Sequence, residues 1–432
     1  MSRFGRFGFI GLSRLRWLGR RIPSPGLGRD LNLLLGGQFV GNAGSRIFDL
    51  VLIWFALELS DSYAAVGFLV FLRFAPYALF GLVCGWLSDR LDRRRLIVGA
   101  ELFRAILLVA AAGLLLAGMA PLVVLGAVAF LLTAARTLFQ PAVQGLLPQL
   151  AHGQALIRAN AVLHGSIETV GVAAPVLGGL LLLVLPVPAI LTLIAATFIL
   201  SAGLSRAVHV PVTLAPYAPA TGRLQWRDLV DEYASLWRVL SGARRDVRAA
   251  IVVNVAGILG VAGVLSLLIP IFVKDHLAAG PDVLGLLWSI MALGTLAGAV
   301  FSVRIAPRWR ERGMLLGWLV YGLLLGALAI PADLVVIFAI GFILAAAGAI
   351  ADILFATLIQ ERMPGEHVSK TFAGFSTLAN TGEAVSAPAL GLVAGLYGIG
   401  AAFAAGAALP VIAALAGLLW LSGRRMTQRD AP

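Results

Sequence analysis

The side chains that could do chemistry in this 432-residue chain are polar residues set inside long apolar runs. In the first run, Gln38, Asn42, Ser45, Arg46 and Asp49 recur at spacings of three to four residues, which places them on one face of a helix. We expect Arg46 and Asp49 to form an ion pair that keeps Asp49 charged until substrate or a conformational change breaks it. The alternative is a fixed structural ion pair between two helical bundles.

The fifth apolar run carries His164 and Glu168, one helical turn apart on the same face. Ionisable groups inside apolar helices are costly, so they face a cavity or a partner. Because an environment poor in water favours the neutral form of a carboxyl group, such a group can take up and release a proton as its surroundings change. We therefore expect Glu168 to be the group that binds and releases a proton. The alternative is a neutral or paired glutamate that only holds helices together.

Other polar side chains within apolar runs are candidates for the same cavity. They are Asn254, Asp352, Asn380 and Glu383 in the second half of the chain, and Arg136 in the first half. Either Asp352 or Glu383 is an alternative site for the proton, and the sequence does not rank them. Arg136 is a cation that can neutralise a nearby carboxylate.

Composition identifies an integral membrane protein. Hydrophobic residues make up 60% of the chain, charged residues make up 12%, and the mean hydropathy is +0.95, which is more apolar surface than a water-soluble fold can bury. The formal charge of +12 falls in alternate loops rather than in one patch, which argues against nucleic acid as a partner. The single cysteine, Cys84, offers neither a disulfide framework nor a metal site, and we expect no cofactor.

The sequence contains no recognisable enzyme site. Its five histidines are scattered, and no Ser/His/Asp or metal-ligand arrangement is formed. A nucleotide-binding glycine-rich loop is also missing, so ATP is not expected to be the energy source.

Twelve apolar runs are long enough to cross a bilayer as helices. They are Leu31–Leu59, Ala64–Leu87, Leu96–Ala117, Val123–Leu147, Ala159–Leu185, Val187–Leu204, Ala249–Val273, Val283–Val303, Met314–Ile330, Leu334–Leu358, Phe372–Leu396 and Ala401–Leu421. Most connections are short, so successive helices run antiparallel. The sequence thus predicts an all-α integral membrane fold with twelve transmembrane helices.

Arginines are concentrated in alternate loops. They follow the second, sixth, eighth and last runs, whereas the opposite loops carry mainly acidic residues such as Glu58, Asp61 and Asp282. Because basic residues stay on the cytoplasmic side, we expect both termini to be cytoplasmic, in the inner or plasma membrane. The tail 1–30 has no signal-peptide core and is expected to be disordered or to lie on anionic lipid as a short helix.

The two halves of the chain repeat at an offset of about 212 residues. Asn42 corresponds to Asn254, and Ala174-Pro175-x-x-Gly178 corresponds, one residue adrift, to Ala387-Pro388-x-x-Gly391. We therefore expect two pseudo-symmetric six-helix bundles. The expected domains are a basic tail (1–30), a first bundle (31–204), a cytoplasmic linker (205–248), a second bundle (249–421) and a C-terminal tail (422–432).

The loop after the second run carries the segment Gly85-Trp-Leu-Ser-Asp89-Arg90-Leu-Asp92-Arg93-Arg94-Arg95. Its pattern Gly-x-x-x-Asp-Arg-x-x-Arg-Arg resembles the signature between the second and third helices of the major facilitator superfamily. The aspartate at position 92 and the upstream Arg73-Phe-Ala-Pro76 resemble the branch of drug and siderophore exporters related to macrolide-efflux proteins. The resemblance implies the all-helical fold described above.

The resemblance also implies a cytoplasmic gate in which Asp89 contacts Arg93 and the helix start near Thr371, where a carboxylate is stabilised by the helix dipole. The alternative is that the basic cluster only fixes the orientation of the chain. The nearby Glu101 and Arg104 are expected to pair structurally with this loop. The gating residues are expected to be Gly85, Asp89, Arg90, Arg93 and Arg94.

A second motif, Gly171-Val-Ala-Ala-Pro175-Val-Leu-Gly178-Gly179, resembles the antiporter signature Gly-x-x-x-Gly-Pro-x-x-Gly-Gly of the same superfamily, with alanine in place of one glycine. Small residues allow close helix contact, and the proline permits a kink. We expect Gly171, Pro175, Gly178 and Gly179 to form a helix-packing motif.

Together these features imply a secondary active transporter rather than an enzyme. The resemblance implies proton-coupled antiport that exports small amphipathic compounds, such as drugs, macrolides or siderophores, by alternating access, and hence antibiotic resistance. The alternatives are a lysophospholipid or metabolite carrier of the same fold and a non-transporting sensor. The expected partners are a small amphipathic substrate, protons and membrane lipids, and the chain is expected to be a monomer.

Overall fold

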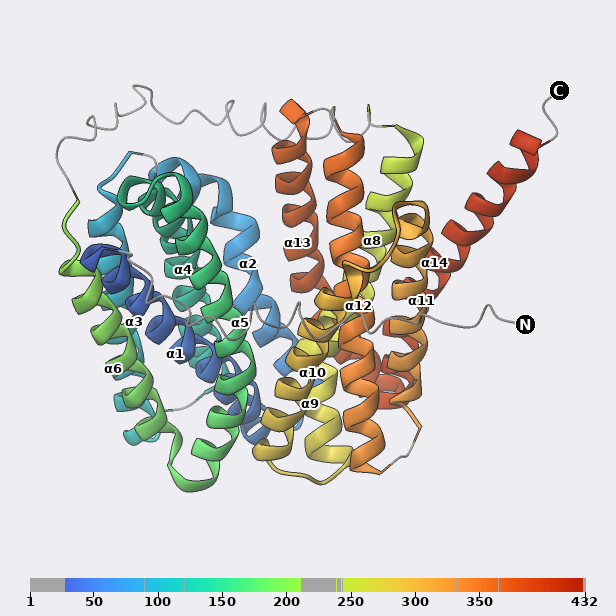
Figure 1. Cartoon of the computed structure of the whole chain (residues 1–432). Helices are drawn as coiled ribbons and strands as arrows, with labels where there is room; N and C mark the ends of the chain where they lie inside the picture. Colours follow the sequence, from blue (N-terminus) through green and yellow to red (C-terminus); the bar gives the residue numbers. More distant parts are fainter. Residues whose placement is uncertain are drawn as a thin grey trace, which may run out of the picture.

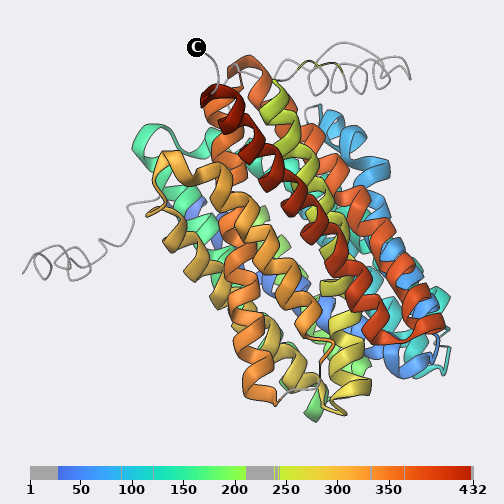
Figure 2. The ribbon, with the colours of Figure 1, turned by 90° about the vertical axis from the view of Figure 1, so that its right-hand side faces the viewer.

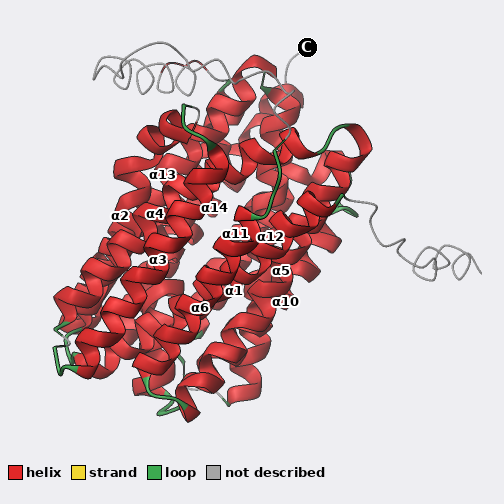
Figure 3. Cartoon of the chain, turned by 90° about the vertical axis from the view of Figure 1, so that its left-hand side faces the viewer, coloured by secondary structure: helices red, strands yellow, loops and turns green. Residues whose placement is uncertain are grey.

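The computed structural model describes residues 28–88, 90–119, 121–210, 244–330, 333–363 and 365–429, together with residues 238 and 242. Throughout these ranges the regular structure is helical, with no strand (Figures 1 and 3), and this confirms the all-α prediction. The expectations about the tail 1–27, about Asp89 and about linker residues 211–237 concern positions outside the described residues.

The first half of the described chain forms long helices joined by short connections. They are α1 (Arg29–Leu59), α2 (Tyr63–Ser88), α3 (Arg93–Leu116), α4 (Leu122–Leu150), α5 (Gly153–Val184) and α6 (Val187–Arg206). Pro121 and Pro186 precede α4 and α6, at helix starts where a missing backbone N–H costs no hydrogen bond. Asp92 caps α3, because its carboxylate accepts a 3.1 Å hydrogen bond from the backbone N–H of Arg95.

The second half opens with a span that changes its helical type. It runs as α8 (Arg245–Gly263), the π-helical segment η2 (Val264–Leu268), α9 (Ile269–Ile271) and a second π-helical segment η3 (Phe272–His276). Pro270 lies between the π-helical segments, where its missing N–H disturbs the regular hydrogen-bond ladder. The later elements are α10 (Pro281–Ser302), the 3₁₀ turn η4 (Pro307–Trp309), α11 (Arg310–Ala327), α12 (Leu334–Arg362), α13 (Gly365–Tyr397) and α14 (Ile399–Arg429).

Ten helical segments of the described chain are long and apolar enough to cross a membrane. The expected spans Met314–Ile330 and Phe372–Leu396 coincide with α11 and α13, which are not among those ten. Helix α11 is 18 residues long and opens with three charged residues, Arg310, Glu311 and Arg312, which lowers its mean hydropathy.

The helices form two groups that lie side by side, α1 to α6 on one side of Figure 1 and α8 to α14 on the other. In the first group α1 packs on α5 and α6, α3 packs on α4 and α6, and α2 packs on α4. In the second group α12 packs on α10 and α11, while α14 crosses the outer face over α8 and α11 (Figure 2). The two groups meet chiefly where α2 packs on α13 and α5 packs on α10.

Glycines bring α2 and α13 into backbone contact. A Cβ added at Gly391 of α13 would lie 2.6 Å from the carbonyl oxygen of Tyr63, the first residue of α2. A Cβ added at Gly67, one turn further along α2, would lie 2.9 Å from the carbonyl oxygen of Ala387. Small residues allow helix axes to approach in this way, and larger side chains would separate the two groups.

The contact between α5 and α10 is built in the same manner. A Cβ at Gly179 of α5 would collide with the carbonyl oxygen of Pro281, the first residue of α10. One turn further along α10, a Cβ at Gly285 would collide with the carbonyl oxygen of Pro175. The motif alignment of the predicted repeat pairs Gly178 with Gly391, but it is the next residue, Gly179, that makes the contact equivalent to that of Gly391 on the other side of the molecule.

Candidate functional site

A cavity of about 630 Å³ lies between the two groups of helices, and we call it the central cavity. Helices α1, α2 and α5 line one side, and α8, η2 and α10 to α13 line the other. Its apolar lining includes the aromatic residues Trp288, Trp318 and Tyr321. Drug-sized ligands occupy sites of about 300–1,000 Å³ with mostly apolar walls and a few polar groups, so the central cavity is large enough for one.

One ion pair joins two of the helices, α1 and α2, that line the central cavity. The guanidinium of Arg73 on α2 lies 2.6 Å from the carboxylate of Asp49 on α1. The expectation that Asp49 pairs with Arg46 is therefore wrong, although both residues line the cavity. Spacing along one helix made Arg46 the nearest cation in sequence, but the packing of α2 brings Arg73 closer.

Three further carboxylates line the central cavity. Glu168 projects from α5 in the first group of helices, and Asp352 and Glu383 project from α12 and α13 in the second. Within the described part of the chain, none of the three takes part in an ion pair of 4 Å or less. The structure therefore brings together the three acids that the sequence singled out as sites for a proton, and places them on opposite walls of one space.

The two asparagines predicted in the second half of the chain, Asn254 and Asn380, lie in different surroundings. Asn254 of α8 is fully buried, and its side chain lies against the Asp352 carboxylate. Asn380 of α13 is not among the residues that line the central cavity, whereas Ala379 and Glu383 are. Ala379 and Glu383 are four residues apart and share the face of α13 that lines the cavity. Asn380 lies on a neighbouring face, because each residue of a helix is rotated relative to the one before it.

A second cavity, of about 550 Å³, lies inside the first group of helices, and we call it the side pocket. It is surrounded by α1, α3, α4 and α5, and it shares Arg46 and Ile167 with the central cavity. Of the predicted site residues, Asn42, Arg136 and His164 line the side pocket rather than the central cavity. The polar face of α5 is therefore divided, with His164 facing one cavity and Glu168 the other.

A buried charge network forms one wall of the side pocket. The carboxylate of Glu101 is fully buried and accepts a 3.3 Å hydrogen bond from the guanidinium of Arg104, one turn along α3. Arg104 also donates a 2.6 Å hydrogen bond to the hydroxyl of Ser45, and its guanidinium lies 3.8 Å from the ring centre of Phe198. Glu101 and Arg104 are expected to pair with the loop after α2, but among the described residues they pair instead with each other and with side chains of α1 and α6.

Several side-pocket residues were not selected from the sequence. Gln140 and Gln144 on α4 and Asn160 on α5 also line the pocket. The signal for them is the spacing, because Arg136, Gln140 and Gln144 recur every four residues and share one face of α4. A polar stripe of this kind in an apolar helix indicates a cavity or a polar partner.

The gate motif lies at the end of α2 and the start of α3. Gly85 is the fourth residue from the end of α2, Arg90 follows that helix, and Asp89 lies outside the described residues. Arg93 donates a 2.7 Å hydrogen bond to the carbonyl oxygen of Gly145 on α4, and Arg94 donates one of 2.8 Å to that of Val208. The two arginines therefore tie the start of α3 to α4 and to the end of the α6 segment. The contact expected between Asp89 and Arg93 stays a prediction.

The helix-packing motif is placed at two different surfaces of α5. Gly171 and Pro175 line the central cavity. Gly178 packs on α1, where an added Cβ would lie 3.6 Å from the Cα atom of Ile47, and Gly179 packs on α10. The motif thus contacts both the central cavity and the second group of helices.

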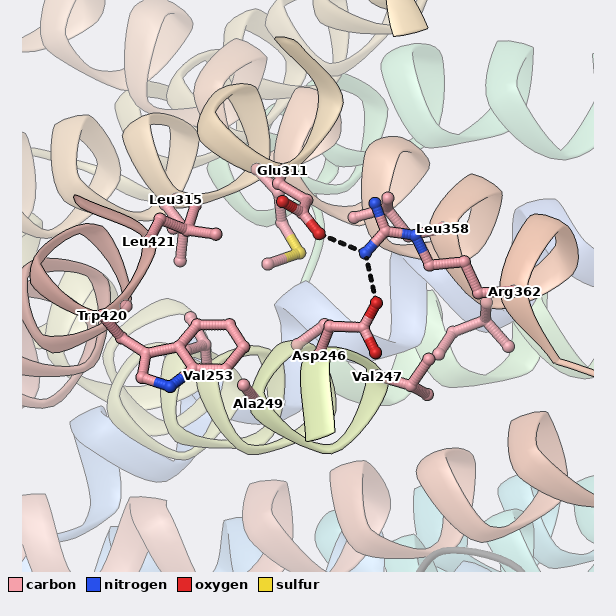
Figure 4. Close-up of a pocket in the computed structure, with 14 residues that line it drawn as sticks. Asp246, Val247, Ala249, Val253, Glu311, Leu315, Leu358, Arg362, Trp420 and Leu421 are labelled. Carbon is pink, nitrogen blue, oxygen red and sulfur yellow. Dashed lines mark hydrogen bonds and ion pairs between the residues drawn. The ribbon is translucent and has the colours of Figure 1, made fainter. Parts of the chain in front are cut away.

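A charged cluster holds together the ends of three helices in the second group (Figure 4). Arg362, at the end of α12, donates a 2.9 Å hydrogen bond to Asp246 on α8 and contacts Glu311 on α11. The adjoining space is about 30 Å³, lined by apolar residues such as Leu315 and Trp420. This space is too small for a drug-sized ligand, so the cluster is a structural link.

Similar proteins match this chain over nearly its full length or over part of it. The family model described as Major Facilitator Superfamily matches residues 34–259 and 250–431. YfiS, an uncharacterised MFS-type transporter of Bacillus subtilis, is 25% identical over 421 residues, which cover 93% of this chain and 94% of YfiS. Macrolide efflux protein A of Streptococcus pyogenes is 36% identical over 77 residues, 18% of each chain.

Solved structures of similar shape are transporters. A bacterial homologue of the iron transporter ferroportin in an inward-facing state has a TM-score of 0.73 at 17% identity, covering 91% of this chain and 98% of that one. The nucleoside transporter NupG has a TM-score of 0.69 at 13% identity, covering 90% and 98% respectively. At such identities the likeness establishes the fold, and the substrates of these proteins differ from one another.

Proposed function

Because the chain belongs to the Major Facilitator Superfamily, we propose that it is a secondary active transporter that exports small amphipathic compounds in exchange for protons. That it is a multi-pass membrane transporter and not an enzyme follows from the family itself and from the full-length relatives. The direction of transport, the proton coupling and the substrate class are our proposal. The partial likeness to macrolide efflux protein A supports export of drug-like compounds.

The observation that carries the proposal is the central cavity. It joins apolar and aromatic walls, suited to an amphipathic compound, with the carboxylates of Glu168, Asp352 and Glu383. Within the described chain none of these three carboxylates takes part in an ion pair, and ionisable groups set among apolar helices mark proton and substrate pathways in transporters. Binding of substrate and binding of a proton then compete for the same space, which is the basis of exchange.

We further propose that the chain has twelve transmembrane helices in two six-helix bundles. The ten apolar spans, together with α11 and α13, account for that number. The proposed bundles are residues 31–204 and 249–421, and the two groups of helices in Figure 1 support this division. The equivalent glycine contacts of Gly179 and Gly391 support an internal pseudo-twofold axis.

The arginine-rich ends of the helices support a cytoplasmic location for both termini in the inner or plasma membrane. At the opposite end the two groups are tied together, because Tyr63 donates a 2.8 Å hydrogen bond to Asp275 and Lys274 contacts the carbonyl oxygen of Leu57. The glycine contacts of Tyr63 and Pro281 lie at the same end. We propose that this arrangement is the state open to the cytoplasm, closed outside by these contacts.

The gate formed by Gly85, Asp89, Arg90, Arg93 and Arg94 would close the cytoplasmic end in the opposite state. The bonds of Arg93 and Arg94 to neighbouring carbonyl groups support a part of this proposal, since they hold the motif against α4 and the end of α6. Breaking and remaking such contacts gives an interface that has two arrangements, as alternating access requires.

The proposal is tested by proton release from the purified protein in weakly buffered detergent, recorded with a pH indicator as erythromycin is added. We expect the wild-type protein to release protons and one of Glu168→Gln, Asp352→Asn or Glu383→Gln to abolish the release. The matched control is Asp333→Asn, which removes an exposed carboxylate that lines neither cavity. Binding of erythromycin without any proton release by the wild-type protein would refute coupling.

A lysophospholipid or metabolite carrier is the alternative function. It is favoured by the side pocket, whose arginines suit a negatively charged head group better than an uncharged drug. If erythromycin does not bind while a lysophospholipid does, the drug-export proposal fails and the carrier replaces it.

A further inference from the structure

The side pocket contains more positive charge than its own carboxylate balances. Arg46, Arg104 and Arg136 line it, and Glu101 is the acid among its lining residues. Arg104 satisfies Glu101, with 3.3 Å between their polar atoms. No carboxylate of the described chain lies within ion-pair distance of Arg46 or Arg136. Arg46 is exposed to the cavities and Arg136 is half-buried, so their charges attract a negatively charged ligand into this pocket.

The side pocket also holds hydrogen-bond donors that have no acceptor. Arg104 and Gln38 are each only 4% exposed, and both line the pocket. Among the described residues, neither the Arg104 Nε–H nor the Gln38 side-chain NH₂ has a hydrogen-bond partner. Buried donors in folded proteins are normally paired. An acidic group offers several acceptor oxygens, and charged pairs with guanidinium groups are the strongest such contacts.

The two cavities have opposite electrostatic character and share a border. Arg46 and Ile167 line both of them. The central cavity carries the unpaired carboxylates and the larger apolar surface, whereas the side pocket carries the excess cations. A bound acid would therefore be repelled by the carboxylates of the central cavity and attracted into the side pocket, while its apolar portion would gain by staying in the central cavity.

We propose that the side pocket binds the acidic group of an amphipathic substrate, a carboxylate, sulfonate or phosphate, while the apolar body of the same molecule occupies the central cavity. This inference rests on the proposed transport function, and it names the substrate class. Arg46 and Arg136 hold the acidic group, and the Nε–H of Arg104 completes its hydrogen bonds. The other source of the same chemistry is a free inorganic anion, which needs no apolar surface.

The test compares two dyes that share one ring system, 8-anilinonaphthalene-1-sulfonate with an acidic group and N-phenyl-1-naphthylamine without one. Each is titrated into the purified protein in detergent, and fluorescence from protein-free micelles is subtracted. The readout is the ratio of the two affinities. We expect Arg136→Gln to lower the preference for the sulfonate about tenfold, the loss of one charge-assisted contact. Arg308→Gln, which removes an exposed arginine outside both cavities, should not change the ratio.

A second variant guards against misfolding of the first. Gln144→Glu preserves the shape of a side chain that lines the side pocket and adds a negative charge there, so it should lower the same ratio. An unchanged ratio in both variants would overturn the inference. So would a result in which sodium phosphate alone raises the Tm of the wild-type protein but not of Arg136→Gln, while the ratio is unaffected, because the site would then hold a free anion.

These measurements use no proton exchange. A wild-type protein that prefers the sulfonate but releases no protons would refute the proposed coupling and leave the acid site standing. A protein that releases protons with erythromycin but shows no preference between the two dyes would refute the acid site and leave the proposed coupling standing.

Discussion

Gly391 of α13 lies so close to Tyr63 of α2 that an added Cβ would be 2.6 Å from the Tyr63 carbonyl oxygen. The contact joins the two groups of helices at the end where Tyr63 also donates its hydroxyl hydrogen bond to Asp275. Real Cβ atoms do not approach backbone oxygen so closely, so glycine is required here for packing rather than for its backbone conformation.

We predict that Gly391→Ala lowers the Tm of the detergent-purified protein, because overpacking against backbone costs about 1–3 kcal/mol. The control is Gly395→Ala, one turn further along α13, where an added Cβ meets nothing within 4 Å. At Gly395 alanine should leave the Tm unchanged or raise it, since alanine favours the helix by about 1 kcal/mol. Shifts of the same sign in both variants would contradict the packing role of Gly391.

The Asp49–Arg73 ion pair leads to a second prediction. Asp49→Asn leaves Arg73 without its carboxylate partner in a half-buried pair, where the two side chains are 21% and 16% exposed, so the Tm should fall. Arg73→Gln should lower it as well, and the double variant should be more stable than the sum of the single effects implies. Thermal unfolding of the four proteins checks this, and additive effects would show that the pair contributes nothing.

The buried network of the side pocket gives a third prediction. Glu101→Gln preserves the side-chain shape but deprives Arg104, which is only 4% exposed, of its carboxylate partner. Because an unpaired buried cation is costly, we expect a lower Tm than for Asp333→Asn, a matched change at an exposed acid. An unchanged Tm for Glu101→Gln would mean that Ser45 and the ring of Phe198 suffice to hold Arg104.

The cluster of Figure 4 gives a fourth prediction. Arg362→Gln breaks the link from α12 to both Asp246 and Glu311. Asp246 retains Arg244, at 3.1 Å, but α12 loses its contact with α8 and α11 through this side chain. We expect Arg362→Gln to lower the Tm and Arg362→Lys to restore most of it, because one nitrogen of the guanidinium, Nη1, makes both contacts and a single ammonium can do the same. A lysine variant no more stable than the glutamine variant would contradict that geometry.

The sequence by itself determined the class of this protein. High hydropathy, twelve long apolar runs and arginines in alternate loops leave a multi-pass helical membrane protein as the physical solution, because backbone polar groups in a bilayer must be satisfied within helices. The motif from Gly85 to Arg95 indicated the family, which the family model confirms. Intramembrane acids such as Glu168, Asp352 and Glu383 were recognisable because charges are rare and costly in such runs.

Only the tertiary structure decided how these residues are grouped. Periodicity along one helix fixes which side chains share a face, but not which neighbouring helix that face meets. Periodicity therefore does not predict that Asp49 pairs with Arg73 on α2, or that α5 places His164 in one cavity and Glu168 in another. The partners of an intramembrane charge are chosen by helix packing, whose close contacts depend on small residues far apart in the sequence, such as Gly179 and Gly391.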